Sequence, residues 1–294
     1  LASPENGRGG RRRHRYHKRF STVFAATTIV RRDVSKMAQH DNRFSVAGSR
    51  TQGAAIDQGL RSYMLMVYNY MAGGVALTGV VAYAMMMMLT TQDPSQAAAQ
   101  LRNGIMLTEL GQTIYGGPVR WVIMLAPLAF IFFISFRVYS MSVGAAQLTF
   151  WAFAAVMGAS LSSIFLIYTG QSIVQVFFVT AAAFGGLSLY GYTTKKDLTG
   201  WGSFLIMGLI GIIIAALVNI FLQSSALQFA ISAIGVLVFA GLTAYDTQRI
   251  KDGYYEVAGN AELAAKTAIM GALNLYLDFI NMFQSLLYLF GDRE

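Results

Sequence analysis

The chain has 294 residues, of which 55% are hydrophobic and only 12% are charged, and its mean hydropathy is +0.50. This composition excludes an ordinary soluble globular protein, in which about a quarter of the residues carry charge. The net charge of +8 does not indicate a nucleic-acid-binding body, because residues 1–36 hold ten Lys and Arg against two acids and the rest of the chain holds twelve of each sign.

Residues 1–62 form the first predicted region, a basic and disordered extension followed by a hydrophilic lead-in. Residues 1–36 contain no Met, whereas Met37 opens the lead-in, so one interpretation is that the natural chain starts at Met37. A second is an Arg-rich, acid-poor transit peptide, which would place the protein in the mitochondrial inner membrane. A third is a basic tail that binds nucleic acid or anionic lipid.

Residues 63–294 form the second region, in which apolar segments long enough to cross a bilayer recur. About 20 helical residues at 1.5 Å per residue span a hydrocarbon core of about 30 Å. The pattern predicts an all-α membrane protein, a bundle of seven transmembrane helices joined mostly by short connections, with one long loop at 90–120. The predicted helices are 64–89, 121–141, 145–168, 172–192, 201–223, 227–250 and 263–290.

Lys and Arg are distributed unevenly over the connections, and such an asymmetry predicts the orientation in the membrane. The connections that are cytosolic when the N-terminus is cytosolic hold Arg137, Lys195, Lys196, Arg249, Lys251 and Lys266. The opposite connections hold only Arg102 and Arg120. We therefore expect a multi-pass protein in the lipid bilayer of the bacterial cytoplasmic (inner) membrane, with its N-terminus in the cytosol and no nucleic-acid partner.

The chain has no Cys, and its three His residues (His14, His17 and His40) all precede the first apolar segment. Disulfides, thiolate or imidazole metal sites, and catalysis by Cys or by a Ser-His-Asp triad are therefore excluded from the bundle. Chemistry there has to use carboxylates, Lys and Arg, hydroxyls, amides and the backbone. We expect neither an enzyme nor a bound cofactor.

An acid, Asp278, lies in the middle of the last apolar segment, within LNLYLDFINMF. A charge inside a membrane is costly, so it faces other helices or a wet cavity and commonly marks a functional site. At 100° per residue, Asp278 shares one helix face with the polar residues Thr267, Asn274, Asn281 and Ser285. The alternative is a structural ladder of hydrogen bonds, but such a ladder does not need an acid.

A second acid, Asp246, lies in FAGLTAYDTQRIKDGYY, near the end of the sixth segment. Taken alone, it is an interfacial acid with Arg249 as a partner one turn later. However, the turn-prone Gly259 lies near the midpoint between Asp246 and Asp278. A helical hairpin that turns there would bring both carboxylates to a similar depth on adjacent antiparallel helices.

Two carboxylates enclosed by helices cannot both ionise without a large cost, so we expect Asp246 and Asp278 to share a proton. With one proton they can bridge the two helices by a hydrogen bond, and without it they repel each other and attract cations. The pair alone would bind Ca²⁺ weakly and transiently, because this ion takes six to eight oxygen ligands. Weak binding suits permeation better than storage.

A third charge, Arg137, ends the segment RWVIMLAPLAFIFFISFR. It lies 16 residues after Trp121, which is roughly 24 Å along a helix and therefore close to the cytosolic interface. Arg137 either extends its side chain to water or pairs with a deprotonated carboxylate as a counter-ion.

The chain contains four sequence motifs, which in chain order are VMGASLSSIFLIYTGQSI, FGGLSLYGYTTKKDLT, GLTAYDTQRIK and LNLYLDFINMFQSLLYLFG. In these stretches the sequence resembles the Bax inhibitor-1 family of transmembrane Bax-inhibitor-motif proteins, in its bacterial form, over roughly residues 60–290. Several ordered motifs at suitable spacing are more specific than any one of them.

The resemblance implies a seven-helix bundle whose last helix lies near the centre, and a pH-sensitive calcium leak in which Ca²⁺ is the permeating ion. It implies a paired-aspartate proton sensor at Asp246 and Asp278, and a linked arginine at Arg137. The sequence departs from the family pattern at two places. Tyr288 stands where a basic residue usually follows the final Leu pair, and the second apolar segment has no acid.

Two other functions remain open. A membrane protein that transports nothing, but regulates a membrane protease or another membrane partner, would also have polar helix faces. An intramembrane aspartyl protease also has two aspartates on adjacent helices. Against a protease, Leu275-Tyr276-Leu277-Asp278 stands where that class has Gly-x-Gly-Asp, and no Pro-Ala-Leu motif is present.

Overall fold

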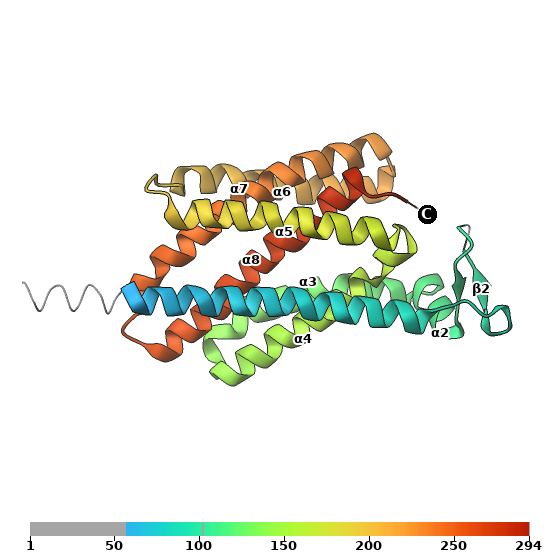
Figure 1. Cartoon of the computed structure of the whole chain (residues 1–294), viewed down its shortest axis with the longest axis horizontal. Helices are drawn as coiled ribbons and strands as arrows, with labels where there is room; N and C mark the ends of the chain where they lie inside the picture. The colour runs from blue at the N-terminus through green and yellow to red at the C-terminus, as the bar shows by residue number, and fades with distance from the viewer. Residues whose placement is uncertain (1–56, 102, 294) are drawn as a thin grey trace, which may run out of the picture. The chain divides into compact units, whose positions relative to one another are not determined.

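The computed structural model describes residues 57–101 and 103–293. The predictions for residues 1–36, for a start at Met37 and for most of the extension 1–62 lie outside the described residues. The described part contains seven helices that are long and apolar enough to cross a membrane (Figure 1). The predicted all-α, seven-helix architecture is therefore confirmed.

The helix bounds agree with the apolar segments to within a few residues at most ends. We call Asp57–Leu89 the N-terminal helix; the others are α3 Val119–Arg137, α4 Val143–Leu161, α5 Gly170–Thr193, α6 Thr199–Leu222, α7 Ser225–Val257 and α8 Ala261–Phe290. The 3-10 turns η3 (Val138–Ser140) and η4 (Ser162–Leu166) continue α3 and α4. The N-terminal helix begins seven residues before its apolar segment and α7 ends seven residues after its own. Hydrophobicity marks the membrane span, whereas a helix can continue into water.

Side-chain caps begin several of these helices. A side-chain oxygen at the N-cap accepts a hydrogen bond from the third residue after it at α4, α5, α7 and α8, and the capping residues are Ser142, Thr169, Ser224 and Asn260. Such caps satisfy amides that have no partner within the helix, and each contributes about 1 kcal/mol. Because the capping residues lie in the short connections, these connections set where each helix begins and divide the apolar region into separate antiparallel helices.

Helix α8 lies at the centre of the bundle, as the resemblance implied. Of its spanning window 61% is buried inside the protein, against 6% for α6. It packs against α4, α5 and α7, and in Figure 1 it crosses the bundle obliquely to the other helices. The Tyr276 ring of α8 stacks edge-on against Phe150 and Phe153 of α4. A central helix can carry polar groups because its neighbours, and not lipid, surround it.

Residues 90–120, expected to be a loop, contain a small antiparallel sheet. Its strands are β1 (Thr90–Thr91), β2 (Ala99–Gln100) and β3 (Met106–Leu107), in the order β1-β3-β2. The helical turns η1 (Pro94–Gln96), α2 (Glu109–Gly111) and η2 (Gln112–Gly116) complete the segment. Strands of two residues are too short to give a period-2 pattern in the sequence.

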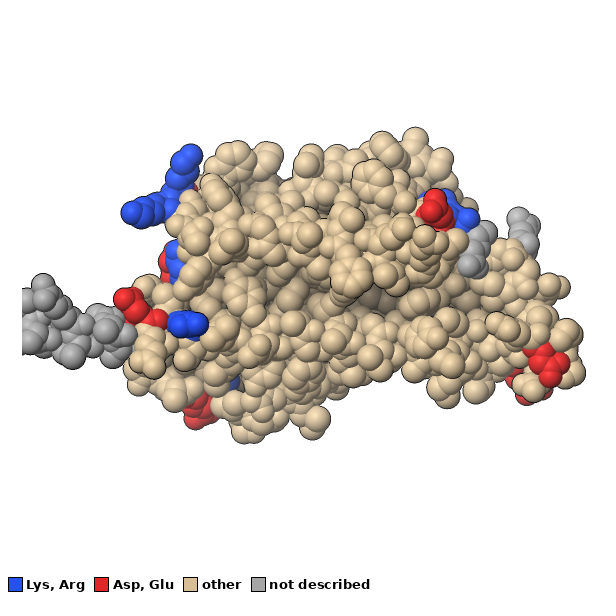
Figure 2. Space-filling model, viewed as in Figure 1, with Lys and Arg blue, Asp and Glu red and all other residues tan. Residues whose placement is uncertain are grey.

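The charged side chains visible in Figure 2 gather at the two ends of the molecule, and the surface between them is uncharged. Many large apolar side chains are exposed on this middle part; on α6 they include Phe204, Met207, Ile214 and Phe221. A surface of this kind is unfavourable in water and favourable in hydrocarbon. Together with the seven long helices, it indicates a protein that crosses the membrane.

Candidate functional site

The two acids that the sequence singled out, Asp246 on α7 and Asp278 on α8, lie together inside the bundle. They are only 9% and 4% exposed, and their carboxyl groups are close enough to interact with each other. Among helices α2 to α8, the pair α7 and α8 has the most extensive contact, so both acids lie at a closely packed helix interface. A hydrogen bond between two carboxyl groups requires that one of them holds a proton.

One oxygen of this pair, Oδ2 of Asp278, is buried and has no hydrogen-bond partner among the described residues. Buried polar atoms in proteins are nearly always paired, and an unpaired carboxylate oxygen is more costly than an unpaired neutral group. This oxygen therefore favours occupation by a proton or by a cation. The atom marks the centre of the candidate site.

The only ion pair of these two acids within the described residues joins Asp246 to Arg249, whose guanidinium nitrogen is 4.0 Å from the carboxylate oxygen. The Arg249 side chain is 63% exposed, so water and salt screen its charge and the pair contributes little to stability. The interaction of Arg249 with Asp246 nevertheless depends on the charge of the carboxylate, and is therefore lost when Asp246 is protonated.

The polar face of α8 turns towards α7. Thr267 and Asn274 line a pocket shared with α7, and Ser285 contacts Gly235 of α7 closely enough that a Cβ on the glycine would lie 2.8 Å from the serine hydroxyl. Asn281 donates a hydrogen bond of 2.8 Å to the carbonyl oxygen of Leu277 within α8 itself. The stripe therefore runs along a helix interface, as polar groups in a membrane require.

A pocket of about 610 Å³ lies at the end of the bundle where the α7–α8 turn is located. Its walls include charged groups from α7, namely Arg249, Asp252 and Glu256. Neither aspartate lines the pocket, but two of its lining residues are neighbours of the pair: Asn274 lies one turn before Asp278, and Arg249 contacts Asp246. Water and ions thus have access to the neighbourhood of the pair from one side of the membrane.

One residue of the site that the sequence did not reveal is Gln248. Its side-chain oxygen accepts a hydrogen bond from the amide of Leu198, and its side-chain nitrogen donates one to the carbonyl oxygen of Lys196, each 2.8 Å long. Lys251 adds a bond of 3.1 Å to the carbonyl oxygen of Tyr192. The α5–α6 connection is therefore attached to α7 beside Asp246. In the sequence Gln248 resembles any polar residue at a helix end, so no signal pointed to it.

We expect Gln248→Leu to detach this connection. The substitution removes both an acceptor and a donor, and each lost bond costs about 1 kcal/mol. Hydrogen–deuterium exchange should therefore rise at least about tenfold in residues 196–199. Gln228→Leu is the matched control, because Gln228 bonds to Asn219 at the opposite end of α7. Equal exchange of 196–199 in both variants would show that these bonds do not hold the connection.

A second polar chain joins α7 to two other helices. The Tyr68 hydroxyl of the N-terminal helix is 2.7 Å from the Ser188 hydroxyl of α5, which is 2.9 Å from the Thr247 hydroxyl of α7. Thr247 is the residue next to Asp246. A movement of α7 at the aspartate would therefore be transmitted to α5 and to the N-terminal helix.

The structure does not bring Arg137 to the aspartates. Arg137 is exposed at the end of α3 and forms no ion pair in the described part of the chain. A different cation, Lys266 of α8, is buried near the end of α3. Its ammonium group is 2.7 Å from Glu262 and 3.4 Å from the carbonyl oxygen of Tyr139. The exposed position of Arg137 agrees with the alternative in which its side chain extends into water.

The described residues contain no cluster of three or more His, Cys, Asp or Glu side chains that could hold a metal ion. The aspartate pair offers four carboxylate oxygens, fewer than the six to eight that Ca²⁺ prefers. A cation at the pair would keep several water ligands and exchange readily.

Comparison with known proteins gives a consistent result. A family model described as "Inhibitor of apoptosis-promoting Bax1" matches residues 60–294. An uncharacterized protein of Caulobacter vibrioides is 47% identical over 240 residues, which is 82% of this chain and 92% of that protein. Inner membrane protein YbhL of Escherichia coli is 41% identical over 254 residues, 86% of this chain and 100% of that protein. Uncharacterized membrane protein SpyM3_0260 of Streptococcus pyogenes is 32% identical over 240 residues, which cover 81% of this chain and 96% of that protein.

Proposed function

Because the chain belongs to the Bax inhibitor-1 family of membrane proteins, we propose that it is a pH-sensitive calcium leak of the bacterial inner membrane, with Asp246 and Asp278 as its proton sensor. The observation that supports this proposal most directly is the buried carboxyl pair with an unpartnered Oδ2 on Asp278. A group of this kind changes its contacts when it gains or loses a proton. The relative from Escherichia coli is named an inner membrane protein, which supports the membrane assigned.

The sensor works through the charge of the pair. While one proton is shared, the two carboxyl groups attract each other and hold α7 against α8. When the proton leaves, two like charges about 4 Å apart repel by about 4 kcal/mol at an effective dielectric constant of about 20. This exceeds the roughly 1 kcal/mol of a typical hydrogen bond, so the α7–α8 contact loosens and a cation is attracted to the site.

The described arrangement suits the closed state of such a leak. On one side of the pair, the pocket of about 610 Å³ is lined by polar and charged groups. On the other side, Ser285 packs against Gly235, and the Tyr276 hydroxyl is 2.6 Å from that of Thr78. A hydrated ion could therefore approach the aspartates from the pocket and would need the far side of α8 to move before it could cross.

The distribution of Lys and Arg supports a proposal that the pocket faces the cytosol. The helix ends and the α5–α6 connection at that end hold Arg137, Lys195, Lys196, Arg249, Lys251 and Lys266, and an excess of Lys and Arg is typical of the cytosolic side. The N-terminal side of the chain is then cytosolic as well. On this assignment the proton sensor monitors cytosolic pH.

Calcium flux into liposomes that contain a calcium dye and the purified protein tests the proposal. Protein-dependent flux that changes with pH is expected. Absence of flux, together with a stoichiometric membrane partner in the purified sample, would instead indicate a non-transporting regulator, for example of a membrane protease. Cleavage of a model transmembrane substrate that is lost in Asp278→Asn would indicate an aspartyl protease.

The same assay compares the two candidate counter-ions of the sensor. Arg249→Gln removes the cation that lies 4.0 Å from Asp246, so the ionised form of Asp246 is less favoured relative to the protonated form. The pH of half-maximal flux should therefore rise. The rise should be less than about one pH unit, because the arginine is exposed and its charge is screened. Arg137→Gln should leave the pH of half-maximal flux unchanged. A shift in Arg137→Gln alone would assign the counter-ion to Arg137 in another conformation.

A further inference from the structure

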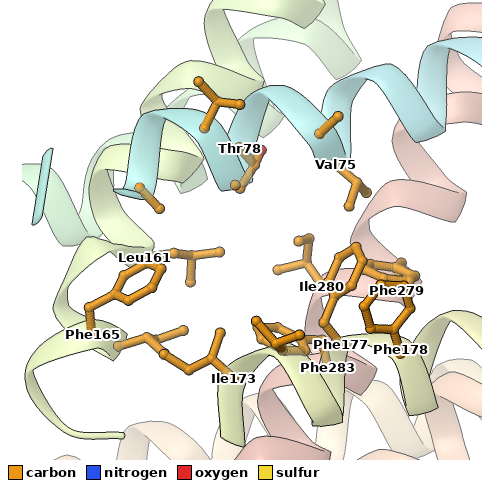
Figure 3. Close-up of a pocket in the computed structure, with 16 residues that line it drawn as sticks. Val75, Thr78, Leu161, Phe165, Ile173, Phe177, Phe178, Phe279, Ile280 and Phe283 are labelled. Carbon is orange, nitrogen blue, oxygen red and sulfur yellow. The ribbon is translucent and has the colours of Figure 1, made fainter. Parts of the chain in front are cut away.

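A second pocket, of about 390 Å³, lies on the opposite half of the bundle from the charged pocket. Figure 3 shows side chains from four elements around it: the N-terminal helix (Val75, Thr78), the end of α4 with η4 (Leu161, Phe165), α5 (Phe177) and α8. Its volume is within the range of about 300–1,000 Å³ that is usual for small-molecule sites. The proposed calcium leak assigns no ligand to this pocket.

The wall of this pocket is almost entirely apolar. The only lining side chain with a polar atom is Thr78, and its hydroxyl is already bonded to the Tyr276 hydroxyl at 2.6 Å and to the carbonyl oxygen of Ala154 at 2.9 Å. Water needs two to four polar partners in a cavity, and apolar cavities stay dry and take apolar ligands. The pocket therefore selects hydrocarbon over water.

The pocket opens to the side of the bundle that faces lipid. Three of its lining residues, Val80, Val174 and Phe178, are 66%, 54% and 66% exposed, and all three lie within membrane-spanning helices. What surrounds an opening at this depth is the hydrocarbon of the bilayer. An acyl chain can enter from the side, whereas a soluble ligand would have to cross the headgroups first.

A cation lies near one end of the pocket. The segment that follows α8 is attached to the start of α5: the Thr169 amide donates to the Asp292 carbonyl oxygen at 3.0 Å, and the Asp292 amide donates to the Ser172 hydroxyl at 2.9 Å. Arg293, which is exposed, stacks on the rings of Tyr168 and Tyr288 at 5.8 and 4.8 Å. Neither tyrosine lines the pocket, but Phe165 and Ile173, which precede and follow Tyr168 in the chain, do, so the guanidinium lies on the same end of the bundle as the pocket and can meet the headgroup of a lipid bound there.

We propose that this pocket binds one acyl chain of a phospholipid whose phosphate contacts Arg293. Lipid tails are as apolar as the pocket wall, so hydrophobicity alone gives no preference for the bound state inside a membrane. Selectivity comes from the fit against the phenylalanine rings and from the pairing of guanidinium with phosphate. The bound lipid would bridge the N-terminal helix, α5 and α8.

Glycine 79 offers a way to fill the pocket without disturbing the fold. Gly79 lines the pocket, and a Cβ built on it meets nothing within 4 Å. In Gly79→Leu the new side chain can therefore occupy the pocket. The matched control is Gly211→Leu on α6, where a Cβ also meets nothing within 4 Å and which does not line the pocket. Both changes favour helix formation equally.

The test uses liposomes of phosphatidylglycerol in which a small fraction carries a photoreactive diazirine on one acyl chain. After illumination, mass spectrometry of the digested full-length protein should find labels concentrated on the pocket residues. We expect at least a fivefold loss of this labelling in Gly79→Leu and no loss in Gly211→Leu. Labelling spread evenly over all exposed helices, or equal in the two variants, would overturn the proposal.

The headgroup contact is tested separately. Arg293→Gln should reduce pocket labelling by the phospholipid at least twofold, but not labelling by a diacylglycerol with the same diazirine chain, because the diacylglycerol has no phosphate. Equal labelling of the wild type and Arg293→Gln by the phospholipid would overturn the role of Arg293. Neither result depends on calcium flux.

Discussion

Calcium flux through Asp278→Asn should lose its response to pH. The asparagine amide is neutral at every pH and can donate a hydrogen bond to Asp246, so it imitates the protonated acid. Between about pH 5 and 8, a range in which buried carboxyl groups commonly titrate, the wild-type flux should change by about tenfold or more, because each 1.4 kcal/mol of altered contact is a factor of ten. The flux of the variant should stay within about twofold of the wild-type value at acidic pH.

Asp197→Asn is the matched control for this experiment, because it removes an acid from the same end of the bundle. Hydrogen bonds from the side chain and the backbone amide of Thr199 hold the pKa of Asp197 below its usual value. Its carboxylate is therefore ionised throughout the tested range and has no part in the response. Asp197→Asn should retain the pH profile of the wild type. Identical profiles for the wild type and Asp278→Asn would refute the assignment of the sensor.

The second large effect is expected at Gly191 of α5. A Cβ on this residue would collide with the carbonyl oxygen of Ala244 and lie 2.9 Å from its carbonyl carbon, both of which belong to the backbone of α7. A backbone atom cannot give way as a side chain does, so α5 and α7 have to move apart. We expect Gly191→Ala to destabilise the protein by about 1–3 kcal/mol, although the same change in an open helix stabilises by about 0.5–1 kcal/mol.

Gly186→Ala, on the same helix, provides the contrast. A Cβ at this position meets nothing within 4 Å, so the substitution should leave the unfolding temperature unchanged or raise it. Thermal unfolding of both variants in one detergent measures the difference. Ala244 lies two residues before Asp246, so Gly191→Ala should also alter the pH response of calcium flux. A Gly191→Ala protein as stable as the wild type would contradict the close contact of α5 with α7.

The number and approximate bounds of the helices followed from the sequence because apolar segments of membrane length are a strong one-dimensional signal. The juxtaposition of Asp246 and Asp278 followed from a similar argument, since a hairpin places residues equidistant from its turn at the same depth. The small sheet in 90–120 did not, because its pairing joins segments that are separate in the chain. Hydrophobicity also does not show where α7 ends in water, and so the helix is longer than its apolar segment.

The partners of the charged groups could not be predicted from the sequence. Both Arg137 and Arg249 were candidates for the aspartates in the sequence, and only the rotation of α3 and α7 about their axes distinguishes them. Arg249 lies one turn from Asp246 on the same helix, whereas Arg137 is itself exposed at the end of α3. The hydrogen bonds of Gln248 to the α5–α6 connection depend on the packing of a loop against a helix, for which no sequence pattern exists.

Composition and the order of residues therefore determined that this protein crosses a membrane, that its net charge belongs to an N-terminal extension, and that chemistry in the bundle cannot use Cys or His. These conclusions need no contact between distant residues. Only the tertiary structure decided that the polar face of α8 meets α7, that one oxygen of Asp278 has no partner in the described bundle, and that an apolar pocket opens to lipid on the other half. The reason is that burial and hydrogen-bond pairing depend on how helices far apart in the chain pack together.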